Sequence, residues 1–103
     1  MPRVRWGEGP KTVLRVRAPE AGTLRFFARC RVYRYNQVMT VLVDGRPAGE
    51  FPLEGGDWRT VAARVPVGPG EHTVELVYTV WDEEAGGPPN AVLFRALKTT
   101  LER

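Results

Sequence analysis

Few residues of this sequence have the chemistry that catalysis needs. His72 is the only histidine, Cys30 is the only cysteine, and the sequence contains no serine. Nucleophilic catalysis requires a nucleophile, a base and a group that orients the base. Cys30 lies in an alternating apolar pattern, which predicts a buried and unreactive thiol. We therefore expect His72 to be a hydrogen-bonded structural residue and the protein not to be an enzyme.

Metal ligands are equally sparse. A single imidazole without a second histidine or cysteine does not make a zinc site. Three consecutive acids, Asp82, Glu83 and Glu84, offer oxygen atoms, yet they lack the alternating spacing of a calcium loop. The sequence thus predicts no cofactor, and it gives calcium no support.

Aromatic residues are the best candidates for ligand binding. Trp58 opens an apolar run between Asp57 and Arg59. A sugar ring can stack on an indole while its hydroxyls bond to such neighbours, although Trp58 could instead plug the end of a β-sandwich. We expect Trp81, beside the acidic loop, to be the more exposed aromatic, and Trp6 to cover an open sheet edge.

A basic and aromatic segment runs from Arg29 to Asn36 and includes Tyr33 and Tyr35. Arginine and tyrosine on one strand face could bind single-stranded nucleic acid. The same pattern also describes a solvated sheet face, and 15 basic against 12 acidic residues give a net charge of only +3. We interpret the segment as a solvated face and nucleic acid as an unlikely partner.

Hydrophobic residues recur with a period of two, which indicates strands. Leu24, Phe26, Ala28, Cys30 and Val32 alternate with arginines, except that Phe27 breaks the pattern. Asp44-Gly45 is typical of a tight hairpin turn, and Pro52 indicates a sheet edge. No helical repeat is convincing. Strands are expected over residues 12–17, 24–32, 37–43, 48–53, 58–65, 72–81 and 90–100, with loops between them that include 66–70 and 82–89.

Seven or eight strands at intervals of roughly ten residues predict an all-β antiparallel sandwich or barrel. The 103 residues suffice for one domain, 1–103, with one core. No segment has the apolar length of a membrane span or the pattern of a secretory signal, so we expect a cytoplasmic protein without membrane contact. The composition, rich in arginine, glycine and proline, suggests a GC-rich or heat-adapted source.

Four segments together resemble the galactose-binding-like, jelly-roll carbohydrate-binding modules. They read AGTLRF from Ala21, VLVDGRPAG from Val41, DWRTV from Asp57 and PGEHTVEL from Pro69. The resemblance implies a jelly-roll sandwich that binds sugar at the loops of one end or on a concave sheet face. At the loop end it implies an aromatic role for Trp58 and a polar role for Asn90, which follows Gly-Gly-Pro-Pro.

The sequence therefore predicts a non-catalytic binding module for carbohydrate or a similar polar ligand. The expected site contains Trp58 and Asn90, with Asp57, Arg59 and Trp81 beside them and the 82–89 loop above. Stacking and a few hydrogen bonds predict weak affinity, about 0.1 to 1 mM. The alternative is a cytosolic interaction or homo-oligomerisation module of the same fold, without a small-molecule ligand.

Overall fold

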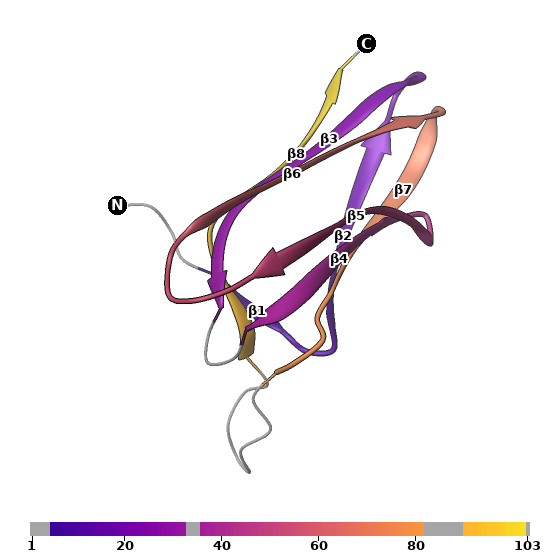
Figure 1. The fold of residues 1–103 in the computed structure, drawn as a ribbon. Helices are drawn as coiled ribbons and strands as arrows, with labels where there is room; N and C mark the ends of the chain where they lie inside the picture. Colours follow the sequence, from indigo (N-terminus) through magenta and orange to yellow (C-terminus); the bar gives the residue numbers. More distant parts are fainter. Residues whose placement is uncertain (1–4, 33–35, 82–89, 103) are drawn as a thin grey trace.

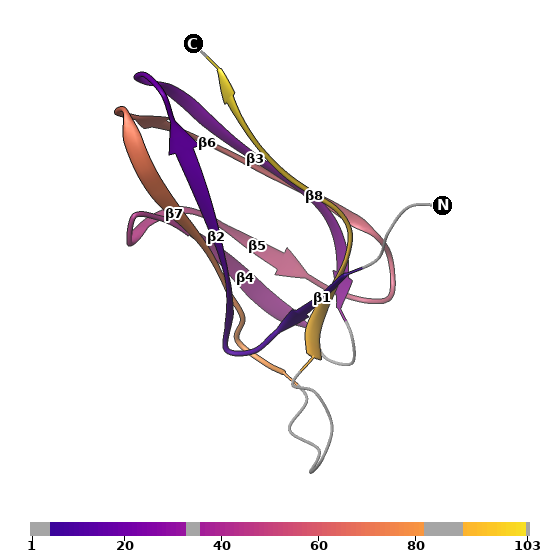
Figure 2. The same ribbon diagram turned by 180° about the vertical axis from the view of Figure 1, so that it is seen from behind.

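The computed structural model of the protein describes residues 5–32, 36–81 and 90–102, and it consists of two four-stranded antiparallel sheets packed face to face (Figures 1 and 2). In the first sheet, the strand order is β1-β8-β3-β6; in the second, it is β2-β7-β4-β5. The strands are β1 (Arg5–Glu8), β2 (Lys11–Ala18), β3 (Gly22–Val32), β4 (Gln37–Val43), β5 (Arg46–Leu53), β6 (Arg59–Val67), β7 (Gly70–Val77) and β8 (Asn90–Glu102).

The chain crosses repeatedly between the two sheets. Only β4 and β5 are consecutive strands of the same sheet, and the turn between them is Asp44-Gly45, with φ values of 51° and 80°. Positive φ at both central residues gives the twist that a two-residue hairpin needs. Every other connection passes from one sheet to the other. The predicted all-β jelly-roll sandwich is confirmed.

Buried and outward-facing side chains alternate along β3, and the buried ones form part of the core. Its even positions from Leu24 to Val32 are buried, whereas Phe27 and Arg29 are exposed on the outer face. In the second sheet, side chains at alternate positions of β4 and β7 are also buried, including Met39 and Leu76. Side chains from the two inner faces fill the space between the sheets, as aligned packing requires. Cys30 is buried in this core, as predicted.

Strand β1 is absent from the sequence-based expectation. It has four residues and pairs with β8, where it covers the edge of the first sheet. Gly7 allows this pairing, because a Cβ at Gly7 would lie 2.2 Å from the Tyr78 hydroxyl. The Tyr78 hydroxyl instead shares a 2.6 Å hydrogen bond with the Thr12 hydroxyl. Burial raises the pKa of Tyr78 to about 12, so this phenol stays protonated at neutral pH.

Two strand ends differ from expectation. Strand β6 continues through Pro66 to Val67, where the sequence predicts a turn, and β7 ends at Val77, not at Trp81. Pro66 is tolerated because β6 is an edge strand, whose outer side needs no backbone donor. The inference that Pro52 marks an edge is confirmed, since β5 is the edge of the second sheet.

Gly70 begins β7 with a φ of 116°, a backbone angle that residues with a side chain rarely adopt. We expect Gly70→Ala to lower the free energy of unfolding by about 1–3 kcal/mol. Gly68→Ala is the matched control: a Cβ at either position would point into open space, and only Gly70 has a positive φ. Urea denaturation measures the difference, and equal effects of the two substitutions would contradict the backbone argument.

Candidate functional site

The predicted site residues come from connections at one end of the sandwich. Asp57 and Trp58 precede β6, Trp81 follows β7, and Asn90 begins β8. Asp57 and Arg59 are exposed, and Trp58 is half-buried. The 82–89 loop and the side chain of Asn90 lie outside the described residues, as do Tyr33, Tyr35 and the side chain of Trp6.

Two guanidinium groups lie close to the ring of Trp58 on the outer face of the first sheet. The Cζ atoms of Arg31 and Arg95 are 5.8 Å and 5.7 Å from the centre of its ring. Guanidinium groups at this distance are attracted to the negative face of an indole. Trp58 is therefore held by side chains of β3 and β8, and it is not among the partly buried residues that pack against the hydrophobic core.

Register and a β-bulge bring these three residues together. Strands β3 and β6 pair as far as Cys30 opposite Arg59, so the next position brings Trp58 beside Arg31. In the pairing of β3 with β8, the register shifts between Arg29 and Cys30, and Arg95 is the extra residue. A bulge redirects a side chain. The exposed Arg95 consequently joins Arg31 at the indole ring.

Trp81, which the sequence predicts to be the more exposed aromatic, belongs to the same burial class as Trp58. It is half-buried and packs against the hydrophobic core. Its indole covers Gly9, since a Cβ on Gly9 would lie 2.2 Å from Trp81 Cγ. Because β7 ends at Val77, the alternation that predicts an outward Trp81 no longer applies at residue 81.

Two amides stabilise this end of the sandwich. Asn36 Oδ1 accepts a 2.9 Å hydrogen bond from the Gly55 amide, which fixes the β5–β6 loop that precedes Trp58. Gln37 is only 7% exposed, and its Nε2 donates to the Ala91 carbonyl. Its Oε1 has no partner among the described residues. Gln37 lies in phase with the buried Met39, Val41 and Val43 of β4, but its polar side chain does not identify it as buried from the sequence.

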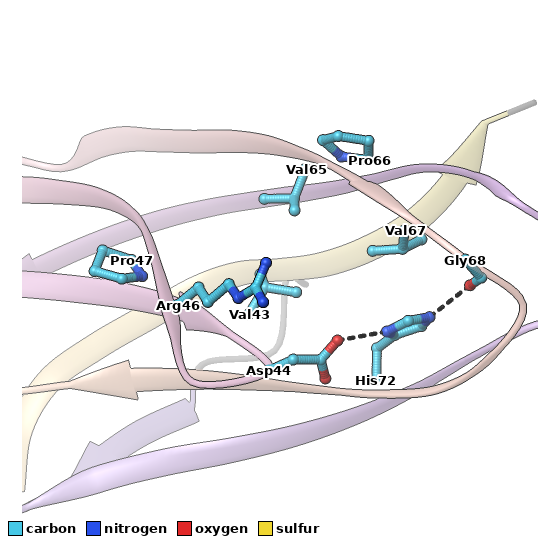
Figure 3. Close-up of a pocket in the computed structure, with 9 residues that line it drawn as sticks. All are labelled: Val43, Asp44, Arg46, Pro47, Val65, Pro66, Val67, Gly68 and His72. Atoms are coloured by element: carbon cyan, nitrogen blue, oxygen red, sulfur yellow. Dashed lines mark hydrogen bonds and ion pairs between the residues drawn. The ribbon is translucent and has the colours of Figure 1, made fainter.

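A separate pocket of about 370 Å³ lies at the opposite end, between the β4–β5 turn and the end of β6 (Figure 3). Apolar side chains of Val43, Val65 and Val67 line it together with Arg46. His72 is also part of the lining, and its side chain is 11% exposed.

His72 bonds through both ring nitrogens. Nδ1 is 2.6 Å from Asp44 Oδ2, and Nε2 is 2.7 Å from the Gly68 carbonyl oxygen (Figure 3). Both partners only accept, so an imidazolium that donates from both nitrogens satisfies the arrangement. The hydrogen bond that His72 donates to Asp44 accordingly raises the pKa of His72, and the same bond lowers the pKa of Asp44. A ring with both nitrogens engaged is unsuited to act as a general base.

Because of the Asp44–His72 pair, we expect the free energy of unfolding to depend on pH. The pKa of His72 is raised above its ordinary 6.5, so its contribution is complete below pH 6.5 and is lost as the pH rises through the raised value. The pKa of Asp44 is lowered from 3.8, so its contribution is present above pH 3.8 and is lost when the pH falls through the lowered value.

Urea midpoints should therefore fall as the pH rises from about 6 to 9, and this slope should be much smaller in His72→Gln. Asp44→Asn should reduce the slope as well, because it removes the carboxylate that holds the charge. Identical pH profiles for the wild type and His72→Gln would show that the pair does not contribute to stability.

Little reactive chemistry remains in the described ranges. Burial raises the pKa of Cys30 to about 11, which keeps it a thiol at neutral pH. No group of three or more histidine, cysteine or acidic residues is arranged to hold a metal ion within residues 5–32, 36–81 and 90–102. In the same ranges, no helix has the length and hydropathy needed to cross a membrane.

No family model matches the sequence, and no curated protein is similar to it in sequence. Solved structures with the same fold include the C-terminal domain of EclA, a sugar-binding protein, with a TM-score of 0.68 and 15% identity over 97% of this chain and 79% of that one. A family 35 carbohydrate-binding module from an environmental isolate has a TM-score of 0.63 and 19% identity, over 91% of this chain and 67% of that one.

A third match is the carbohydrate-binding module CBM36 in complex with calcium and xylotriose, with a TM-score of 0.62 and 10% identity over 94% of this chain and 78% of that one. Larger proteins also contain the fold. The chain spans 13% of a cycloisomaltooligosaccharide glucanotransferase from Paenibacillus sp., with a TM-score of 0.59, 21% identity and 90% of this chain covered. The chain thus has the fold of carbohydrate-binding modules. Identities of 10–21% extend the likeness to the fold alone.

Proposed function

We propose that the protein binds carbohydrate without catalysing a reaction, at a site centred on Trp58. The observation that carries the proposal is the cluster of Trp58 with Arg31 and Arg95 on the outer face of the first sheet. An indole provides apolar surface for a sugar ring, and guanidinium N–H groups donate to its hydroxyls. The shared fold supports this role, since EclA and the CBM36 module are sugar-binding proteins.

The neighbouring residues extend the site toward the loop end. Asp57 and Arg59 flank Trp58 and are exposed, so both can bond to hydroxyls. Asn90 and the 82–89 loop remain part of the proposal on sequence grounds. Trp81 is not included in the proposed site, because it packs against the core.

Titration of the protein with neutral and acidic oligosaccharides, followed by tryptophan fluorescence and isothermal calorimetry, tests the proposal. We expect dissociation constants of about 0.1 to 1 mM for at least one sugar. Light scattering on the same sample measures the particle mass. If no saccharide binds and the particle has twice the monomer mass, the proposal is wrong, and the alternative of an oligomerisation module is supported.

A further inference from the structure

Six of the 15 basic residues of this protein lie on one face. Strands β3, β6 and β8 contain seven basic residues and one acidic residue, a formal charge of +6. The whole chain carries +3, so all its other residues together carry −3. Six of the seven define what we call the basic face, the outer face of the first sheet: Arg25, Arg29, Arg31, Arg64, Arg95 and Lys98.

Like charges face each other across strands of the basic face. Arg25 lies directly opposite Arg64 on β6. Identical charges at directly opposed positions destabilise a sheet. Glu102 forms an ion pair with Arg25, and it is the only acidic residue of these three strands.

The outer face of the second sheet is built differently. There, Lys11 forms a 2.7 Å ion pair with Glu75, and Arg17 lies opposite Glu71. Opposite charges therefore alternate across β2 and β7, which is the usual stabilising arrangement. Within the described strands, unpaired cations therefore cluster on the first sheet. This clustering departs from the preference for opposite charges on neighbouring strands, and it lowers stability. Such departures are expected at functional sites.

The basic face also contains a shallow hollow of about 240 Å³. Arg25, Arg64 and Lys98 line it around the exposed ring of Phe27. Alternate residues of a strand are about 6.5 Å apart and adjacent strands are about 4.8 Å apart, so the cations form a two-dimensional lattice and not a single row. Such a lattice can bind a chain molecule that carries several anions.

We infer that the basic face binds an acidic polysaccharide, one that carries carboxylate or sulfate groups. The inference rests on the proposed carbohydrate-binding function and specifies its ligand class. Five of the six cations are arginine, whose planar guanidinium binds carboxylate in a bidentate manner. Hydroxyls of Thr60 and Thr100, at outward positions beside these cations, can bond to sugar hydroxyls.

The distribution of aromatic rings favours a polysaccharide over single-stranded nucleic acid. Proteins that bind single-stranded nucleic acid stack successive bases on aromatic side chains. Among the described residues, Phe27 is the one exposed aromatic ring within the lattice, and the ring of Trp58 is half-buried with Arg31 and Arg95 beside it. The face therefore offers many charges and little stacking surface.

Affinity electrophoresis in gels that contain polygalacturonate, alginate or chondroitin sulfate tests the inference, with fully methyl-esterified polygalacturonate as the uncharged match. We expect retardation by at least one acidic polymer, little by the ester, and at least about a tenfold loss of affinity when the salt rises from about 0.05 to 0.5 M. Arg29→Gln/Lys98→Gln should weaken binding about tenfold. Arg15→Gln/Arg17→Gln, on the other sheet, removes the same charge and should change affinity little.

The other possible results of this experiment distinguish a failure of the inference from a failure of the proposed function. Equal binding of the ester and the acidic polymer, unaffected by Arg29→Gln/Lys98→Gln, would overturn the inference and leave the proposed function intact. Failure of all three acidic polymers while a neutral oligosaccharide binds would do the same. Failure of every saccharide, charged or neutral, would overturn both. Tighter binding of a 20-nucleotide oligo-dT at equal salt would assign the basic face to nucleic acid instead.

Discussion

Phe26→Ala is expected to lower the free energy of unfolding by about 3–5 kcal/mol. Phe26 is 1% exposed and lies on β3, an inner strand that pairs with both β6 and β8. Removal of the ring leaves a cavity that the two sheets cannot close without losing their pairing. Since small domains are stable by about 5–15 kcal/mol, this one change would remove a large part of the total. Urea denaturation followed by tryptophan fluorescence measures the loss.

Phe27 provides the matched control for this prediction. It is the next residue of the same strand, yet its ring is 38% exposed on the outer face. We expect Phe27→Ala to cost less than about 1 kcal/mol. Losses of equal size at the two positions would mean that the inner and outer faces of the first sheet are wrongly assigned.

Trp58→Ala is expected to weaken saccharide binding at least tenfold, which corresponds to about 1.4 kcal/mol. The substitution removes the indole and leaves Arg31 and Arg95 without the ring that orders them. The fold should survive, because Trp58 lies on the outer face of the first sheet, beside side chains of β3 and β8, and does not pack against the core between the sheets. Calorimetric titration of the variant measures the affinity, and circular dichroism verifies the fold.

Two control variants test whether a loss of binding is specific to Trp58. Arg17→Ala changes an exposed residue of the second sheet and should leave the affinity unchanged. Trp81→Phe keeps an aromatic ring against the core and should also bind normally. If Trp81→Phe abolishes binding while Trp58→Ala does not, the site lies at the loop end and our placement of it is wrong.

Much of the fold is predictable from the sequence because one face of each sheet is buried. The alternation from Leu24 to Val32 predicts both the strand and its inward side chains, since a shift by one residue would exchange the two faces. Asp44-Gly45 predicts the hairpin, because few other pairs adopt the required φ values. Strand β1 is unpredictable by this approach: it has four residues, one of them glycine, and depends on the room that Gly7 leaves for Tyr78.

The candidate site is predictable only in part. Trp58 could be selected as an aromatic beside polar neighbours, but its contact with Arg95 depends on a β-bulge that no glycine or proline marks in β8. The Asp44–His72 contact joins residues 28 positions apart and follows from the pairing of β4 with β7. The orientation of Trp81 is not predictable from the alternation, which holds only within a strand, because β7 ends at Val77.

The central claim is that carbohydrate binds around Trp58 on the first sheet. The most direct test is a titration of the isotope-labelled protein with the best-binding oligosaccharide, followed by amide and tryptophan side-chain NMR shifts. We predict that the shifts concentrate at Trp58, Arg31 and Arg95 and leave His72 unchanged. Shifts that concentrate around His72 and Arg46, or the absence of any shift with every saccharide, would contradict the claim.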